Sequence, residues 1–359
     1  MKKRLVATAL MATLLSMRIF AQDPSYSQFF SSPLNINPAL TGQVEGNWRV
    51  ISNLRRQWSG PVSPYNTGTI SFDSKLFQNT DDYYQDQNGM LAIGGMMMYD
   101  ETMGGALKSS YASLNFSGSI RIATGGNSFE ENGMRIRHLN RAENDEGAEQ
   151  RISAGLGFIY GNRRMDFSKL NFEDQFTGNG FDTNLPTGES ALSNMKPYFS
   201  TAAGLLYSYT NANSHWDLGV SAYHFNKPRQ SFLNDPNQYL AARYVIHSNL
   251  ETILGNNFEI MANGVYQYQG GASYFSIGGA LGYYVPASED HDLLLRAGMW
   301  YWSKNAIIPY VGLRYDNFEL GVSYDYTNSR LTQNALRVHT YELSLTLRGL
   351  GNAIPAPWR

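Results

Sequence analysis

Residues 318–327 read Phe-Glu-Leu-Gly-Val-Ser-Tyr-Asp-Tyr-Thr, and every second position carries a large apolar or aromatic side chain. The intervening positions carry polar residues and glycine. Successive side chains of a strand point to opposite faces of a sheet, so this period of two predicts a strand with one apolar and one polar face. The same alternation recurs at 257–269, 291–303 and 338–349, and helical periodicity is nearly absent. The sequence therefore predicts an all-β fold.

Fourteen segments share this pattern, and most are longer than the roughly 5 to 6 residues usual in soluble sheets. They match the roughly 9 to 11 residues with which a tilted strand crosses a bilayer. Closing an even number of antiparallel strands into a barrel also removes exposed sheet edges. We therefore predict a transmembrane antiparallel β-barrel of about 14 strands at residues 46–349, preceded by an extended N-terminal segment. The expected strands lie near 46–55, 64–73, 89–100, 107–123, 150–163, 198–209, 213–225, 240–253, 257–269, 271–286, 291–303, 306–316, 317–327 and 338–349.

The N-terminus has the order of a secretory signal. A basic start at residues 2–4 precedes a mostly apolar run at residues 5–17, and Ala21 offers a small residue for cleavage. The run is shorter than the roughly 17 to 25 apolar residues of a membrane-spanning helix, which favours a cleaved signal at 1–21 over a retained anchor. An exported chain rich in membrane-length strands is expected to be an integral outer-membrane protein.

Composition and charge exclude several functions. Charged residues make up 16% of the chain, below the roughly 25% of soluble domains. The formal net charge of -2 provides no basic field for nucleic acid. The chain has no Cys, which excludes disulfides, thiolate metal ligands and a lipid-anchored N-terminal Cys. Tyrosine pairs near strand ends, such as Tyr266 and Tyr268, favour aromatic girdles at the boundary of a membrane.

Motifs that would indicate catalysis or cofactor binding are missing. The six His residues show no spacing typical of metal ligands. The segment 321–325 begins like a nucleophile elbow but lacks the closing glycine, and Gly155-Leu156-Gly157 is not followed by a helical pattern. We expect no enzyme activity, no metal and no cofactor. Carboxylates on the polar parity are expected to form lumen ion pairs with arginines; these residues are Glu319, Asp325 and Glu342, with Arg296, Arg314 and Arg348.

The segment at 22–45 does not follow the strand pattern. It is rich in Pro and Asn, and its prolines forbid a central strand or a helix interior, which favours an extended path with turns. A plug in the lumen, a periplasmic strap and a docking segment for a partner all remain open at this point.

Two long connections differ in character. Segment 124–149 carries six acidic residues without periodicity, and 164–197 is rich in Asn, Gly and Pro. If the strand that begins at residue 46 starts from the periplasm, 164–197 faces outside and 124–149 faces inside. Residues 350–359 form a tail after the last strand.

Several of these motifs resemble the PorP/SprF family of type IX secretion system outer-membrane proteins. The residues that carry the resemblance are D-P-x-x-S-Q-F…P-L-x-x-N-P-A-x-T-G at 23–42, Arg56-Gln57-Trp58, and the segments 321–329 and 339–345. The resemblance implies a 14-stranded outer-membrane barrel without enzymatic activity. It also implies association with the periplasmic ring and the peptidoglycan-associated lipoproteins of the machinery, or retention of a secreted adhesin at the cell surface. The motif positions that carry over as candidate partner-binding residues are Asn37, Pro38, Gly42, Trp58, Tyr324, Asp325 and Ser329.

The expected function is a non-enzymatic scaffold of the type IX secretion or gliding machinery. A rigid barrel would hold its loops outside and the N-terminal segment inside, and so tether or display a secreted partner. Outer-membrane lipid surrounds it, and no nucleic acid is involved. A passive porin or hydrophobic-solute channel is the alternative, because barrels of about 16 to 18 strands leave an aqueous lumen. A secreted soluble β-sandwich is the third and weakest alternative.

Overall fold

The computed structural model describes residues 23–59, 63–76, 89–125, 148–187, 195–231, 235, 237–255, 257–288, 291–303, 306–327 and 339–349. The expected signal at 1–21, the tail at 350–359 and most of the acidic connection at 124–149 lie outside these residues.

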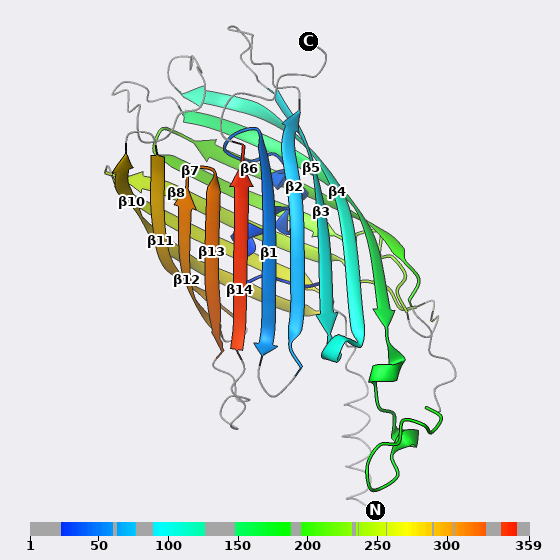
Figure 1. The fold of residues 1–359 in the computed structure, drawn as a ribbon. Helices are drawn as coiled ribbons and strands as arrows, with labels where there is room; N and C mark the ends of the chain where they lie inside the picture. Colours follow the sequence, from blue (N-terminus) through cyan, green and yellow to red (C-terminus); the bar gives the residue numbers. More distant parts are fainter. Residues whose placement is uncertain are drawn as a thin grey trace, which may run out of the picture.

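Fourteen strands form one closed antiparallel barrel, which confirms the predicted fold class (Figure 1). Each strand pairs with its neighbour in sequence, and β14 closes the barrel by pairing with β1. The strands are β1 (Trp48–Ser59), β2 (Tyr65–Leu76), β3 (Gly89–Thr102), β4 (Leu107–Gly125), β5 (Ala148–Met165), β6 (Tyr198–Thr210), β7 (Ser214–Tyr223), β8 (Arg243–Leu254), β9 (Phe258–Gln269), β10 (Ala272–Ser288), β11 (His291–Trp302), β12 (Ala306–Tyr315), β13 (Phe318–Thr327) and β14 (His339–Arg348). Among the described residues, no helix is both long enough and apolar enough to cross a membrane.

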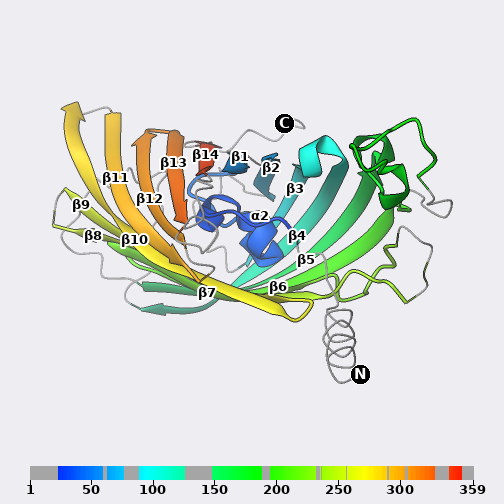
Figure 2. The same cartoon turned by 90° about the horizontal axis from the view of Figure 1, so that it is seen from below.

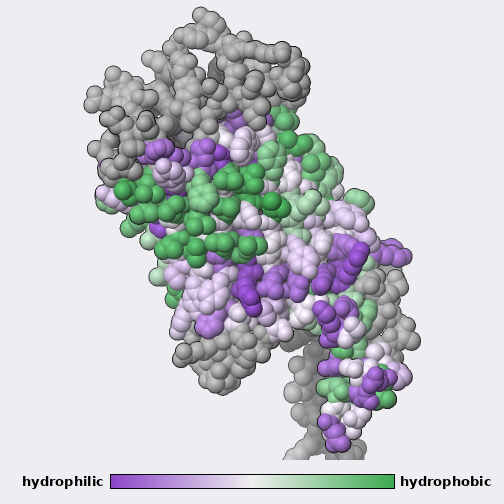
Figure 3. Space-filling model, viewed as in Figure 1, coloured by the Kyte–Doolittle hydropathy of each residue, from purple (hydrophilic) through white to green (hydrophobic). Residues whose placement is uncertain are grey.

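The two parities of each strand face different surroundings. On β2, Phe72 points outward and is 48% exposed, whereas the neighbouring Asp73 points into the lumen and is fully buried. On β14, Leu343 is 40% exposed and Glu342 only 2%. Figure 3 shows the resulting hydrophobic band on the outer surface. The apolar parity therefore faces lipid and the polar parity faces the lumen, as in a membrane barrel.

The two ends of the barrel are named here by the ends of β1. The Trp48 end carries the beginning of β1 and the end of β14, so the described chain leaves the barrel there at Gly349. The Ser59 end carries the connection between β5 and β6, with the short helices η4 (Phe167–Lys169) and η5 (Glu173–Gln175), and the connection between β7 and β8. Helix η3 (Met103–Gly105) lies at the same end, between β3 and β4.

Residues 23–47, called the lumen segment below, lie inside the barrel (Figure 2). The segment contains three short helices, η1 (Phe29–Ser31), α2 (Pro33–Ile36) and η2 (Pro38–Leu40). Two of them begin with proline, whose fixed φ suits the first turn and whose missing N–H is not needed there. The structure therefore places the Pro/Asn-rich stretch in the lumen, which was one of the three alternatives.

Candidate functional site: the occupied lumen

Asp23 holds the start of the lumen segment at the Ser59 end. Its carboxylate lies 2.8 Å from Nε2 of His224 and 3.4 Å from Nε of Arg243, and its backbone N–H donates to Gln269 at 2.9 Å. Burial of the carboxyl disfavours its charged form, but the charges of His224 and Arg243 outweigh this cost, so the pKa of Asp23 lies well below its usual value. Arg243 also donates to the backbone oxygen of Asn35 at 2.9 Å. One arginine thus binds the segment at two points.

Ser27 and Gln28 attach the segment to the last strand of the barrel. Their backbone N–H groups donate to the two carboxylate oxygens of Glu342, at 2.7 and 2.9 Å. The Gln28 amide donates to Ser323 at 3.0 Å and accepts from Ser344 at 2.8 Å. Each polar atom of the Gln28 side chain therefore has a partner, although the side chain is only 1% exposed.

Arg55 on β1 supplies the positive charge at this contact. Its Nη2 lies 3.0 Å from Asp325, and its Nε lies 3.8 Å from Glu342. Ser27 Oγ donates to the same Asp325 oxygen at 2.7 Å, and Arg55 Nη1 donates to the backbone oxygen of Ser25. One guanidinium faces two buried carboxylates, so the N–H and O–H donors of the lumen segment complete the stabilisation of the negative charge.

Asn37 and Pro38 lie against a glycine-lined part of the wall. The Asn37 amide donates to the backbone oxygens of Leu205 and Val220, at 3.0 and 3.3 Å. Its nitrogen also lies 3.1 Å from Nε2 of His247. The wall positions beside this contact cannot hold a side chain, because a Cβ would collide with Asn37, Pro38, Ala39 or His247; they are Gly155, Gly204 and Gly219. These glycines allow the close approach of the segment, which explains their presence inside strands.

Gly42 ends the buried part of the segment near the Trp48 end. Its φ of 74° lies in the left-handed region that glycine adopts without strain, and its N–H donates to Asp73 at 2.8 Å. Arg49 holds the same Asp73 carboxylate at 2.9 Å, and Thr41 accepts from Ser117 at 2.6 Å through its backbone oxygen.

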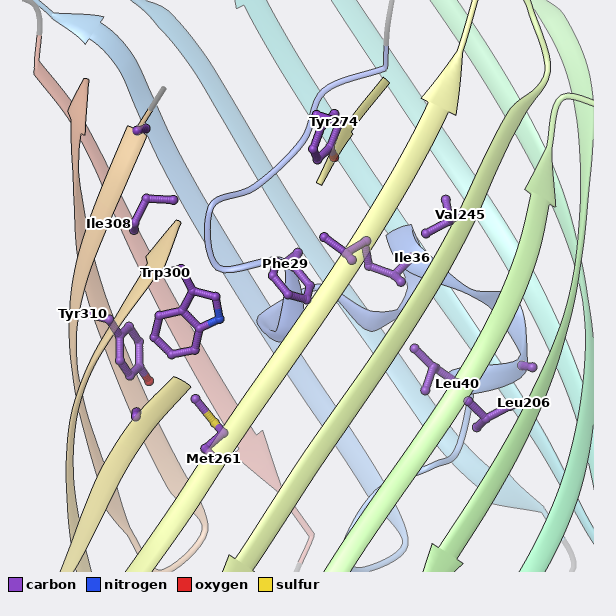
Figure 4. Packing of buried hydrophobic residues seen from close by; sticks show 14 residues of the cluster. Phe29, Ile36, Leu40, Leu206, Val245, Met261, Tyr274, Trp300, Ile308 and Tyr310 are labelled. Carbon is purple, nitrogen blue, oxygen red and sulfur yellow. The ribbon is translucent and has the colours of Figure 1, made fainter. Parts of the chain in front are cut away.

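Apolar side chains of the segment pack against inward-facing apolar residues of the wall (Figure 4). Phe30 stacks on Trp300 with ring centroids 4.8 Å apart, and both contact Tyr310 edge-on. The segment contributes Phe29, Ile36, Ala39 and Leu40 to this cluster, and the wall contributes Leu206, Val245, Met261, Val265, Tyr274, Ala280, Trp300, Ala306, Ile308 and Tyr310. Burying one such large side chain stabilises the folded state by about 1.5–3 kcal/mol, so the cluster opposes release of the segment.

The candidate partner-binding residues fall into two groups. Asn37, Pro38, Gly42 and Asp325 are buried in the lumen, where they hold the segment to the wall. Trp58 and Tyr324 lie on the outer surface, and Trp58 stands at an irregularity in the pairing of β1 with β14 with a φ of 59°. Ser329 lies outside the described residues. Four of the seven therefore lie in the lumen, at separate contacts between the segment and the wall, and partner contact by those four requires the segment to leave the lumen.

Sequence reasoning missed several wall residues of this site, and three charged or ionisable ones illustrate why. Arg55, Arg243 and His247 each contact the segment, and all three stand on the polar parity of their strands. Their position on the polar face of each strand could have predicted that they point into the lumen. It could not reveal their partners, because contacts across a lumen depend on the register of all fourteen strands.

Lumen ion pairs are present as expected, but two of the three carboxylates have a partner other than the expected arginines. Glu319 pairs with Arg296 at 2.8 Å and also with Arg348. Asp325 and Glu342, however, face Arg55 rather than any of the three expected arginines. In the described part of the chain, no group of three or more His, Asp or Glu residues could hold a metal ion.

A family model described as type IX secretion system membrane protein PorP/SprF matches residues 19–347. The chain belongs to the PorP/SprF family. No curated protein matches the chain. With the barrel fold, the family supports an integral outer-membrane location for the protein.

Solved structures that are similar to this chain include toluene transporters and a monoaromatic hydrocarbon channel. The toluene transporter TbuX of Ralstonia pickettii is 10% identical, with a TM-score of 0.38 over 87% of this chain and 92% of its own. The CymD monoaromatic hydrocarbon channel is 6% identical, with a TM-score of 0.44 over 88% and 91%. The P. putida toluene transporter TodX is 9% identical, with a TM-score of 0.38 over 86% and 90%. At these values none of them bears on the role of this member of the PorP/SprF family.

The family motifs at the two ends of this chain meet in the lumen. Asp23, Ser27 and Gln28 of the first motif contact groups on the barrel wall. Ser323 and Asp325 of the β13 motif, and Glu342 and Ser344 of the β14 motif, are among those groups. These motifs thus form two sides of one buried interface.

Proposed function

We propose that this PorP/SprF protein is a non-enzymatic barrel of the type IX secretion or gliding machinery that tethers a secreted surface partner through its loops. The observation that carries the proposal is the occupied lumen. Side chains of the segment and wall interlock along it, and a hollow beside Asp23 and Leu34 measures only about 30 Å³. A barrel filled in this way is suited to holding proteins at a fixed point rather than to passing solutes.

The orientation we propose puts the Trp48 end in the periplasm and the Ser59 end outside. Outer-membrane barrels have short periplasmic turns and longer extracellular loops. The described chain ends at the Trp48 end, and the structured connections 166–187 and 224–231 lie at the other. In this orientation 164–197 faces outside, and the Trp48 end faces the periplasmic ring and lipoproteins of the machinery.

The connection between β5 and β6 is our candidate for the surface that holds the partner. It projects beyond the barrel end (Figure 1). Phe176 and Phe181 pair across it with ring centroids 5.2 Å apart, yet they are 55% and 52% exposed. Aromatic residues that stay exposed on a structured loop are typical anchors of protein contacts.

A hydrophobic-solute channel remains the alternative function. It requires the lumen segment to move, because the segment crosses the lumen from Asp23 near the Ser59 end to Gly42 near the Trp48 end. The channel alternative therefore depends on release of the anchors described above.

Site-specific cross-linking in intact cells tests the tethering proposal. A photo-reactive amino acid replaces Phe181, and the matched control carries it at Leu205, which is 56% exposed on the lipid-facing surface. We expect a covalent adduct with a secreted protein from position 181 and none from position 205. Equal labelling from both positions, or no protein adduct from either while the machinery is active, would rule out this loop as the tether.

A further inference from the structure

Basic side chains on the outward face of the barrel are confined to one place. In the described strands, the outward-pointing Lys and Arg residues are Arg56 on β1, Lys108 on β4 and Arg164 on β5, and all three are exposed. The other strand arginines point into the lumen. Each of the three stands at the Ser59 end of its strand.

The strand register puts these three residues in one row. Arg56 lies opposite Asn66, Asn66 opposite Glu101, Glu101 opposite Lys108, and Lys108 opposite Arg164. Three strand spacings of about 4.8 Å separate the Arg56 backbone from that of Lys108, which amounts to about 14 Å. Glu101 is the one acidic residue in this row, so the row keeps a surplus of positive charge.

Arg56 has no partner among the residues that the structure describes. It lies opposite Tyr341, which itself lies opposite Tyr324, so it stands at the level of outward aromatic rings. Aromatic girdles mark the boundary between hydrocarbon and headgroups. An unpaired guanidinium at that depth meets the phosphates of lipid headgroups.

A groove runs from Arg56 toward the hydrophobic band. It measures about 450 Å³, and its outer-surface lining includes Leu54, Gly68, Tyr99, Val322, Tyr341 and Leu343. Gly68 leaves the notch between neighbouring strands open, because it lies opposite Tyr99 on β3 and Leu54 on β1 and has no side chain of its own. The groove is apolar toward the membrane centre and ends at Arg56. This arrangement suits a lipid whose acyl chain lies in the groove and whose anionic headgroup contacts Arg56.

We propose that this surface binds a phosphorylated glycolipid of the lipid A class in the outer leaflet. One acyl chain lies over Gly68, and the phosphates contact Arg56 and the pair formed by Lys108 and Arg164. The distance of about 14 Å between the backbones of Arg56 and Lys108 favours a headgroup with two phosphates over a glycerophospholipid with one. The assignment uses the orientation proposed above but does not depend on the tethering function.

Lipid titration of the purified full chain in non-ionic detergent tests this site. The probes are diphosphoryl lipid A, phosphatidylglycerol and phosphatidylethanolamine, and the readout is the apparent affinity of each. We expect diphosphoryl lipid A to bind tightest. Arg56→Gln should weaken it about ten-fold, the effect of losing one charge-assisted hydrogen bond, and Arg56→Lys should weaken it less.

Two further variants separate the parts of the site. Gly68→Leu should weaken binding by filling the groove. It should fold normally, because its Cβ would meet the flexible end of Leu54 at 3.3 Å and would have an ordinary contact of 3.9 Å with the backbone oxygen of Asn53. Lys196→Gln is the matched control, because it removes an exposed positive charge in a loop outside the barrel strands. Heat-modifiable electrophoretic mobility checks that each variant is a folded barrel.

Three results would overturn the assignment. The first is an unchanged affinity for lipid A in Arg56→Gln and Gly68→Leu. The second is equal binding of phosphatidylglycerol, which would remove the preference for two phosphates. The third is a membrane protein that cross-links to position 56 in native membranes and is not displaced by lipid A, which would make this surface a protein interface.

Discussion

The backbone N–H of Gln28 donates to Oε1 of Glu342 at 2.9 Å, and so joins the start of the described chain to the last strand of the barrel. The neighbouring N–H of Ser27 donates to the other oxygen of the same carboxylate at 2.7 Å. The Glu342 carboxylate therefore stands on the strand that closes the barrel, and it also binds the segment that fills the lumen.

Glu342→Gln should release the lumen segment. Glutamine keeps one acceptor oxygen and turns an N–H donor toward the two backbone donors of Ser27 and Gln28, so we expect a loss of about 2–4 kcal/mol in stability. Chymotrypsin should then cleave at Tyr26 and Phe29. Trypsin is unsuitable, because the lumen segment has no Lys or Arg.

Glu319→Gln is the control for that experiment. Glu319 pairs with Arg296 and Arg348 on the wall. We expect it to lower the unfolding temperature of the barrel without exposing Tyr26. Equal protease sensitivity in the two variants would show that Glu342 acts only on the barrel wall.

Gly204→Ala should disturb the contact made by Asn37. The added Cβ would collide with the Asn37 amide, and overpacking of this kind costs about 1–3 kcal/mol. At Gly264 a Cβ would have an ordinary contact of 3.9 Å with Ile277, so Gly264→Ala is the matched control. Limited proteolysis of both variants checks the prediction, and equal protection of the segment in both would contradict it.

Acidification should weaken the Asp23 anchor only at low pH. Burial raises the pKa of Asp23, but the charges of His224 and Arg243 outweigh it and lower the pKa, so the contribution of Asp23 is fully present above the ordinary aspartate pKa of about 3.9. The contribution is lost as the pH falls below that value toward the folded pKa. We expect protease protection of the segment to fall below about pH 4. Asp23→Asn should remove this dependence, and an unchanged pH profile in that variant would assign the transition to other groups.

The two ends of the chain should be accessible from opposite sides of the membrane. Asp23 contacts groups at the Ser59 end, whereas Gly349 bonds to Trp48 at the other end. An epitope inserted before Asp23 should bind antibody on intact cells. An epitope placed after Arg348 should do so only after the outer membrane is permeabilised. The reverse pattern would invert the proposed orientation, and with it the leaflet of the proposed lipid site.

Much of the barrel could be predicted from residue alternation. The strict pattern of β13 and β14 gave their location within one or two residues, because side-chain direction follows directly from strand geometry. The end of β1 was missed. The predicted strand 46–55 stops before Ser59 because Arg55, Arg56 and Gln57 are three polar residues in a row, which hides the alternation that β1 keeps in the structure.

The lumen site could be predicted only in part. The prolines of the first motif excluded a strand but could not choose between a plug, a strap and a docking segment. Nothing in one sequence shows that Gly155, Gly204 and Gly219 lie against Asn37 and Pro38, because these residues are far apart along the chain. Arg55 was missed because its contacts depend on the register between β1 and β14, which one sequence does not show.

Single-channel conductance in planar bilayers tests the occupied lumen most directly. The full-length mature protein should give no stable open steps, and the same barrel lacking residues 23–42 should give steps of a water-filled pore. Normal amounts of folded barrel in both preparations are the required control. Stable open steps of equal size from both proteins would show that the segment does not close the lumen, and would favour the channel alternative.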